Sequence, residues 1–247
     1  MTQQSRYIDT SILTKLEVNQ DGIALVDKPS GWSSHDVVNK VRRITRIKRV
    51  GHAGTLDPLA TGLLIILIGR EFTRMQEIFM KQPKEYVVTA QFGITTDSYD
   101  SDGKVVSEVR PNKIEKVTSE EIEEATQPFV GDIDQQVPIF SAIKVDGKKL
   151  YDHGRMQREL QSNDTVSNSV IDVPDLPIKQ VSVQAFELLT LNLPYAKFRV
   201  ACSSGTYVRS LVHDLGDSIG IGATVTQLRR TRIGEFDVQD AIQLLPV

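Results

Sequence analysis

The segment between Gly51 and Ile68 constrains the fold of this chain more than any other. It joins a glycine-rich loop, Gly51–Gly62, to an uninterrupted apolar run, Leu63–Ile68. Such a short apolar run bounded by glycines is typical of a strand buried on both faces. The loop holds a single carboxylate, Asp57, which is followed by Pro58, and its glycines allow backbone conformations that other residues avoid. We therefore expect Asp57 to lie on a turn that leads into a buried strand.

The chain around this loop is basic. No other acidic residue lies between Asp36 and Asp57. The cationic side chains in this interval are Lys40, Arg42, Arg43, Arg46, Lys48 and Arg49. A lone carboxylate in cationic surroundings stays ionised, and such surroundings attract an anionic partner such as a nucleic acid. An Asp before a Pro is equally common in turns and helix caps, so the residues alone leave both a structural and a catalytic role open for Asp57.

Composition limits the remaining function classes. With 247 residues, 40% hydrophobic and 25% charged, the chain can form one large globular domain or two small ones. The net charge is −3, but nine acids and four bases lie between Asp97 and Glu124, so acids and bases are segregated along the chain. The apolar runs are too short to cross a bilayer, and no signal peptide precedes them. The single cysteine, Cys202, excludes an internal disulfide and favours the cytoplasm.

Periodicity and turn residues predict the secondary structure. Strands are expected over residues 22–27, 63–68, 86–92, 181–191, 197–202 and 224–231, with 103–109 as the hairpin partner of 86–92. Helices are expected after an N-cap at Ser34, near 71–80, from 119 to before Pro128, over 148–156, around 208–219 and over 237–245. Residues 131–144 are expected to be extended, Asp146-Gly147 to form a turn, and 160–178 to form a loop. Helices and strands without a regular βαβ alternation predict an α+β fold.

Two motifs resemble the TruB-type tRNA pseudouridine synthases. Gly51–Gly62 reads GHAGTLDPLATG, which resembles that family's catalytic loop and places its catalytic carboxylate at Asp57. Cys202–Leu211 reads CSSGTYVRSL and resembles a second family block, whose arginine, here Arg209, pairs with the catalytic Asp. This chain has Ser204 where that block usually has lysine, a change expected to remove a phosphate contact. The resemblance implies a pseudouridine synthase fold, with a mixed, mostly antiparallel central sheet flanked by helices and RNA-binding loops.

The same resemblance assigns roles to further residues. Tyr86, in a K-x-Y pattern, would stack on the target uracil and assist removal of its C5 proton, and Leu228 would pack on the opposite face of the base. His52 would support the flipped-out nucleotide, and Lys28, in a K-P-x-G pattern, would lie near the active site. From position alone, each of these side chains is equally or better explained as an ordinary packing or turn residue.

The remaining expected RNA contacts are basic. The segment that ends at Lys144 resembles a family segment that belongs to a mobile RNA-gripping loop, an insertion over about residues 132–178. Cationic side chains of the two basic clusters are expected to contact backbone phosphates; they include Arg42, Arg43, Arg229 and Arg230. The four histidines lack ligand spacing, so we expect no metal. A polar arm over residues 1–20 is expected to precede a catalytic domain over 21–247, without the C-terminal PUA domain that bacterial members usually have.

The resemblance implies a cytoplasmic, monomeric enzyme that isomerises uridine 55 in the T-loop of tRNA. The reaction moves the uracil attachment from N1 to C5 and needs no cofactor. A non-catalytic RNA-binding or tRNA-folding protein on the same scaffold is the alternative from another class, and a synthase acting on another stem-loop is a closer one. A nucleotide-dependent enzyme that uses the glycine-rich loop as a phosphate cradle is disfavoured, because the loop lacks the Lys-Ser/Thr ending of such cradles.

Overall fold

The structure, a computed structural model, describes residues 15–145, 147–162 and 175–244. The expected polar arm therefore lies largely outside the described residues, as do most of the 160–178 loop and Asp146 of the expected turn. The chain divides into two compact units, which are described separately. The first unit contains residues 1–87 and 227–247, and the second contains residues 88–226.

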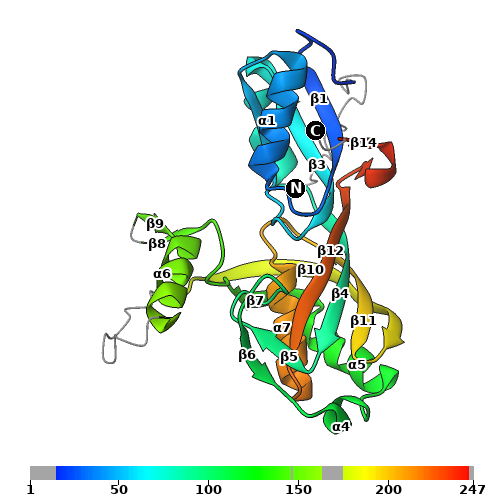
Figure 1. Ribbon diagram of the computed structural model, residues 1–247. Helices are drawn as coiled ribbons and strands as arrows, with labels where there is room; N and C mark the ends of the chain where they lie inside the picture. Colours follow the sequence, from blue (N-terminus) through cyan, green and yellow to red (C-terminus); the bar gives the residue numbers. More distant parts are fainter. Residues whose placement is uncertain (1–14, 146, 163–174, 245–247) are drawn as a thin grey trace. The chain divides into compact units, whose positions relative to one another are not determined.

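The first unit is built around a mixed sheet (Figure 1). Its strands are β1 (Gly22–Lys28), β2 (Val50–Ala53), β3 (Thr61–Ile68), β13 (Phe236–Asp237), β14 (Ile242–Gln243) and parts of β4 (Lys84–Phe92) and β12 (Ala223–Ile233). Its helices are α1 (Ser34–Thr45), α2 (Arg70–Thr73), α3 (Gln76–Met80) and the 3-10 helix η3 (Val238–Asp240). The strand order is β14-β1-β3-β12, with β2 paired to β3 and β13 to β12. β1 and β3 are antiparallel, with Gly22 opposite Ile68 and Lys28 opposite Gly62.

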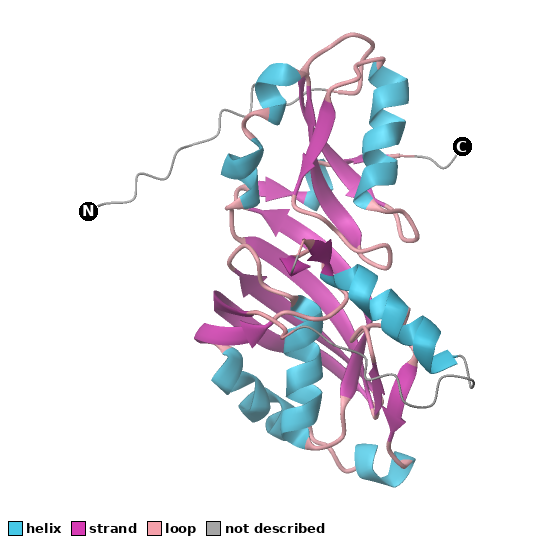
Figure 2. Ribbon diagram, turned by 90° about the vertical axis from the view of Figure 1, so that its left-hand side faces the viewer, coloured by secondary structure: helices cyan, strands magenta, loops and turns pink. Residues whose placement is uncertain are grey.

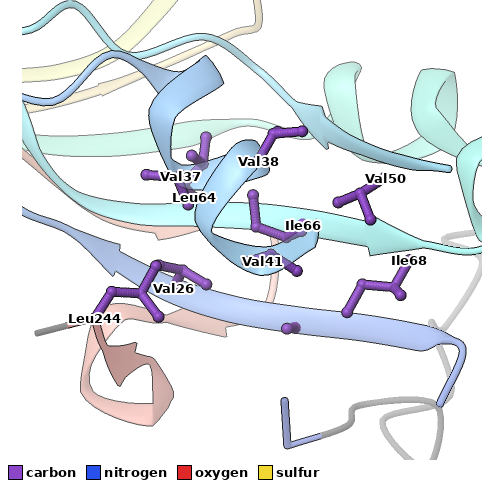
Figure 3. Close-up of a cluster of buried hydrophobic side chains, with 10 residues drawn as sticks. Val26, Val37, Val38, Val41, Val50, Leu64, Ile66, Ile68 and Leu244 are labelled. Carbon is purple, nitrogen blue, oxygen red and sulfur yellow. The ribbon is translucent and has the colours of Figure 1, made fainter. Parts of the chain in front are cut away.

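The expected buried strand is confirmed, because β3 has a hydrophobic cluster on each face. On one face, Leu64, Ile66 and Ile68 pack against the apolar stripe of α1, including Val37 and Val41 (Figure 3). On the other face, β3 contributes to a second cluster; its members include Leu63, Ile65, Leu67, Phe79 and Phe236. This burial fixes the register of β3 and with it the position of the loop that precedes it.

The N-cap of α1 is Ser33 rather than Ser34. The Ser33 side chain accepts a hydrogen bond from the Asp36 N–H, and the Asp36 carboxylate accepts one from the Ser33 N–H, which makes a capping box. Ser34 is instead the first residue of the helix and is buried. The expected helix over 71–80 consists of two short helices, α2 and α3.

The expected helix over 237–245 is wrong. After β13 and η3, the chain forms the short strand β14, which runs parallel to β1 with Ile242 opposite Val26. Leu244 is 8% exposed and joins the core beneath α1. The prediction fails because the helical spacing of the apolar residues is a local pattern. It does not show that the edge of β1 provides backbone hydrogen-bond partners for this segment.

In the second unit, the strands of the main sheet follow the order β12-β4-β11-β10-β7 (Figure 2). Its strands, besides parts of β4 and β12, are β5 (Ile94–Thr96), β6 (Val105–Glu108), β7 (Gly131–Gln136), β8 (Lys144–Val145), β9 (Lys148–Lys149), β10 (Ile178–Asn192) and β11 (Tyr195–Cys202). Its helices are α4 (Pro111–Ile114), α5 (Ser119–Thr126), α6 (Leu150–Ser162), α7 (Val208–Ile219) and the 3-10 helix η2 (Gln127–Phe129). The expected antiparallel pairing of 181–191 with 197–202 is confirmed in β10 and β11.

Three expectations for the second unit need correction. Residues 103–109 do not pair with β4, because β6 pairs with β5 in a separate two-stranded sheet. Gly93, with φ of +91°, separates β4 from β5, and its carbonyl accepts a hydrogen bond from the Val109 N–H at 2.9 Å. In the segment 131–144, only β7 and the first residue of β8 are strand. The helix expected over 148–156 begins at Leu150 and continues to Ser162.

Candidate active site

The loop that carries Asp57 connects β2 to β3 in the first unit. Its backbone is hydrogen-bonded to the segment that leads into α1. The Ser34 hydroxyl accepts a hydrogen bond from the Leu56 N–H at 2.8 Å and donates one to the Leu56 carbonyl at 3.1 Å. The Gly31 N–H donates to the Pro58 carbonyl at 2.9 Å. The Asp57 side chain itself is half-buried. The loop thus presents a partly accessible carboxylate on a backbone that is fixed on both sides of it.

The side chain of Lys28, at the end of β1, also holds the Asp57 loop in place through hydrogen bonds. Its side chain is fully buried, and its Nζ donates to the carbonyls of Pro29 at 2.9 Å, Trp32 at 2.6 Å and Pro58 at 3.3 Å. Burial lowers the pKa of Lys28 from 10.5 to about 8, and the negative charge of Asp57 opposes that shift. The sequence expectation that Lys28 lies near the active site therefore fits its position, and its direct bonds go to the loop backbone.

Arg230, on β12, holds the two ends of the same loop. Its guanidinium donates from Nη2 to the Gly54 carbonyl at 3.0 Å and from Nε to the Leu63 carbonyl at 2.7 Å. Gly62 packs so closely on it that a Cβ there would lie 2.2 Å from the Arg230 carbonyl oxygen. Only 1% of Arg230 is exposed. The expectation that Arg230 contacts RNA phosphates is therefore corrected, because its donors are directed to buried carbonyls and its surface is covered.

The neighbouring residues of β12 also have structural partners. Arg229 forms a two-point ion pair with Asp27, with Nη1 and Nη2 at 2.9 and 2.8 Å from the two carboxylate oxygens. Its side chain is 41% exposed, so a phosphate contact by Arg229 would have to share the guanidinium with Asp27. Leu228 is 7% exposed, and Tyr86, on the adjacent strand β4, is 9% exposed. Both apolar surfaces expected to enclose the base thus come from neighbouring strands of one unit.

His52, on β2, lies at the same end of the first unit. Burial, followed by the positive charges of Arg230 and His35, lowers its pKa below the ordinary value, so the imidazole is neutral near neutral pH. Among the described residues, no group forms a hydrogen bond with its buried Nδ1. A neutral ring with an unused nitrogen is suited to contact with a nucleotide rather than to charge neutralisation.

Arg209 lies in the second unit, at the start of α7. The buried guanidinium donates to the carbonyls of Ser98 at 2.5 Å and Phe140 at 2.8 Å, and its Nη1 lies 3.5 Å from an Asp100 carboxylate oxygen. Asp100 is thus an ionic partner of Arg209 within this unit. The expected pairing of Arg209 with Asp57 joins residues of different units and stays a prediction.

The other expected RNA contacts are dispersed. Lys144 is exposed on β8 of the second unit, before α6. Arg42 and Arg43 lie in the last turn of α1 in the first unit. Arg42 donates to the Val50 carbonyl at 3.0 Å, which places it at the end of β2 opposite the Asp57 loop, while Arg43 is exposed. Arg42 and Arg43 therefore lie at the end of the first unit away from the Asp57 loop, and Lys144 belongs to the other unit.

Within residues 15–145, 147–162 and 175–244, no three side chains of His, Cys, Asp and Glu gather closely enough to hold a metal ion. No helix in this part of the chain is long and apolar enough to span a bilayer.

Sequence comparison identifies the family. Residues 42–208 match the family model of the TruB family pseudouridylate synthase N-terminal domain, and residues 209–246 match that of the tRNA pseudouridylate synthase B C-terminal domain. The chain is 42% identical to a tRNA pseudouridine synthase B from Chlamydia abortus, over 90% of this chain and 87% of the relative. It is 39% identical to one from Clostridium tetani, over 91% of this chain and 71% of the relative.

Solved structures agree on the fold. A chain in a crystal structure of a Cbf5–Nop10–Gar1 complex matches with a TM-score of 0.64 and 27% identity, over 91% of this chain and 53% of that one. An H/ACA RNP bound to a substrate RNA containing 2′-deoxyuridine matches with a TM-score of 0.62 and 25% identity, over 91% and 51%. The chain thus spans about half the length of these solved chains, and the α+β pseudouridine synthase fold is confirmed. The chain belongs to the TruB family of tRNA pseudouridylate synthases.

Proposed function

We propose that this chain isomerises uridine 55 in the T-loop of tRNA to pseudouridine, with Asp57 as the catalytic carboxylate. The observation that carries the proposal is the clamped loop: four independent side chains or N–H groups fix its backbone, yet Asp57 remains half-buried at its tip. The clamping side chains are Lys28, Ser34 and Arg230. A carboxylate held in this way is pre-organised for a reaction that needs one precisely placed oxygen.

The reaction is an internal exchange of bonds. The N1–C1′ bond of the uridine breaks, C5 forms a bond to C1′ of the same nucleotide, and the proton on C5 is lost while N1 gains one. The Asp57 carboxylate acts either as the nucleophile on the sugar or base or as the base that removes the C2′ proton. Atoms and electrons balance within the nucleotide, so the proposal includes no cofactor and no metal ion.

Recognition requires the target base to leave the RNA stack, which costs a few kcal/mol. Tyr86 and Leu228 offer a ring and an apolar side chain for the two faces of the uracil, and base stacking on an aromatic ring contributes ~1–3 kcal/mol. The neutral imidazole of His52 is proposed to support the displaced nucleotide, and Arg209 to pair with Asp57 when RNA is bound. Lys144 and Arg43 are proposed phosphate contacts, since both are exposed.

The proposal is tested by tritium release from tRNA transcripts that carry [5-³H]uridine. The wild-type protein is expected to release tritium from an otherwise unmodified tRNA and to release almost none from the same transcript with cytidine at position 55. Asp57→Asn, which keeps the size of the side chain and removes its charge, is expected to bind the tRNA and to lower release by about 10³-fold or more. Release that survives the cytidine substitution would move the target to another stem-loop. Binding without release by the wild type would favour a non-catalytic tRNA-binding protein.

The oligomeric state is tested with the same preparation. We propose that the protein acts as a monomer in the cytoplasm, where the tRNA substrate is reached without crossing a membrane. Light scattering at the assay concentration should give the mass of one chain, about 27.5 kDa. A mass of two chains under the assay conditions would contradict the monomer.

A further inference from the structure

Exposed cations gather at the end of the first unit that lies opposite the Asp57 loop. We call this set the basic end: Arg43, Arg46, Lys48, Arg49, Arg70 and Arg74. The residues come from the last turn of α1, the connection to β2, and α2. The pairing of β2 with β3, with Val50 opposite Ile68, brings these segments side by side. The Arg49 Nε donates to the Thr73 hydroxyl at 2.9 Å, and the Gly69 N–H donates to the Arg49 carbonyl at 2.8 Å.

The cations of the basic end lack ionic partners within the described residues. Arg43, Arg46, Lys48, Arg70 and Arg74 form no side-chain hydrogen bond or ion pair with any residue that the structure describes. Elsewhere arginines are paired with acids, as Arg158 is with Asp97 and Arg199 with Glu187. The acids at this end include Asp21 beside Gly69 and Glu71 in α2, and neither forms an ion pair with a described cation.

Such an arrangement has an electrostatic consequence. Like charges crowded on one surface repel one another, and they raise the local concentration of anions. The last turn of α1 explains part of the set, because cations stabilise a helix C-terminus. It does not explain Lys48, Arg70 or Arg74, which lie outside that helix. A polyanion that binds across the connection and α2 would relieve the repulsion of the whole set.

The basic end is too far from Asp57 to touch the target nucleotide. The Asp57 loop precedes Thr61, and the basic end surrounds Ile68, so β3 separates them along its length. In Figure 3, Val50 and Ile68 lie at one end of the core and Val37 and Leu64 at the other. At a rise of about 3.3 Å per residue, the seven steps of β3 span about 23 Å. An RNA that fills the active site reaches the basic end only with a part remote from the modified base.

We propose that the basic end is a second RNA-binding surface, which contacts backbone phosphates of the tRNA body outside the hairpin that carries the target uridine. This proposal rests on the proposed function. A five-base-pair stem would extend by about 17 Å at the 3.4 Å per pair of B-form DNA, and an A-form RNA stem is shorter still, so the stem is shorter than β3. A full-length tRNA continues beyond that stem and can reach the basic end. The basic end therefore distinguishes a complete tRNA from its isolated arm, because only the complete tRNA is long enough to contact it. This contact does not depend on the nucleotide sequence.

The test compares two RNAs and two charge-matched variants. The probe variant carries Arg46→Asn, Lys48→Gln and Arg70→Gln. The control carries Lys113→Gln, Lys116→Gln and Lys197→Gln, three exposed lysines of the second unit. Dissociation constants are measured for full-length tRNA and for the five-base-pair hairpin over a series of salt concentrations, after circular dichroism and melting have shown that both variants fold like the wild type.

The probe variant is expected to bind full-length tRNA about tenfold or more weakly, with a salt slope reduced by about 2 to 3, and to bind the hairpin like the wild type. The control is expected to stay within about twofold for both RNAs. Unchanged affinity of the probe variant for full-length tRNA, or an equal loss for both RNAs, would overturn the proposal. Failure of the proposed function has a different signature, since wild-type protein would then bind tRNA and release no tritium.

Discussion

The two ends of the β2–β3 hairpin use the same kinds of side chain in opposite ways. At the Asp57 end, Lys28 and Arg230 are buried and donate to backbone carbonyls of the Asp57 loop and of the start of β3. At the basic end, Lys48 and Arg70 are exposed and lack a side-chain partner among the described residues. The sequence contains clusters of basic residues at both places, so the number of charges does not separate the two roles. The two roles are separated by the burial of each cation and by the identity of its hydrogen-bond acceptors.

A buried cation and an exposed cation contribute differently to stability and to phosphate binding. A buried cation loses hydration, and this loss is tolerated only when several acceptors replace the water. Once those acceptors are the carbonyls of a loop, the cation fixes the loop, and its removal leaves them unsatisfied. An exposed cation keeps its hydration and contributes little to stability, so it remains available to a phosphate. Substitutions at the first end should therefore change stability and rate, and substitutions at the second should change RNA affinity.

The largest effect is expected at Arg230. Arg230→Met leaves the carbonyls of Gly54 and Leu63 without their donor, which lowers the free energy of unfolding by roughly 2–6 kcal/mol. Displacement of the loop should lower the single-turnover rate about 100-fold. Arg230→Lys retains a charge and a single donor nitrogen, so it should fold more stably than the Met variant and recover part of the rate. Urea unfolding and rapid-quench tritium release measure both quantities.

Arg232, an exposed arginine on the same strand, provides the control for Arg230. Its Nε lies 3.9 Å from an Asp237 oxygen, so Arg232→Gln should change the free energy of unfolding by no more than about 0.5 kcal/mol. The loop role of Arg230 is refuted if Arg230→Lys and Arg232→Gln have the same single-turnover rate as the wild type.

Lys28 should give opposite pH trends for stability and rate. Its pKa is about 8 in the folded protein and 10.5 in the unfolded chain, so between these values the unfolded state binds more protons and the stability contributed by this group rises with pH. Below pH 8 both states are protonated and the contribution is constant. Above pH 8 the Nζ loses one of the protons that it donates to three carbonyls, which should loosen Pro58 and slow catalysis.

The measurement compares wild type with Lys28→Met between pH 7 and 9. The difference in unfolding free energy between them should shift in favour of the wild type as the pH rises, while the wild-type single-turnover rate falls and that of the variant does not. Because other titrating groups are shared, they cancel in the comparison. Parallel pH profiles for the two proteins would show that Lys28 does not titrate in this window.

A smaller effect is expected at Ser34, whose hydroxyl bonds both backbone groups of Leu56. Ser34→Ala should lower the free energy of unfolding by about 1–3 kcal/mol and the rate several-fold. Ser33→Ala is a matched control, because it removes the N-cap of α1 at a cost of about 1 kcal/mol without touching the loop. If both variants lose the same activity, the rate follows overall stability rather than the Leu56 contact.

The sequence predicts local elements well and long-range partners poorly. The buried strand β3 follows from its apolar run, and α1 from the spacing of Val37, Val38 and Val41, because both patterns are contained in a short window. The strand β14 could not be foreseen, since its partner β1 lies more than 200 residues away along the chain. The error at 103–109 has a local cause, because the pattern does not show that the strand breaks at Gly93 and that β6 pairs with β5 beyond this break.

At the candidate site too, the sequence predicts local features and misses long-range partners. The motif around Asp57 identified the loop, but nothing in the pattern around Arg230 indicated that its guanidinium is buried between Gly54 and Leu63. A usable sign exists at Gly62: a glycine at the start of a strand indicates that another backbone approaches closely, and in the structure Gly62 has φ of +99° and packs on the Arg230 backbone. Ser34 was assigned to a helix cap because its loop partner, Leu56, is distant in sequence.

The most direct test of this account is single-turnover tritium release from full-length tRNA, measured as a function of enzyme concentration. One titration gives both the limiting rate and the half-saturating concentration. Arg230→Lys is predicted to lower the limiting rate about tenfold or more and to leave half-saturation unchanged. The variant with Arg46→Asn, Lys48→Gln and Arg70→Gln is predicted to raise half-saturation about tenfold or more and to keep the wild-type limiting rate. If both variants change the same parameter, the two ends of the hairpin do not divide positioning from RNA binding, and the account is contradicted.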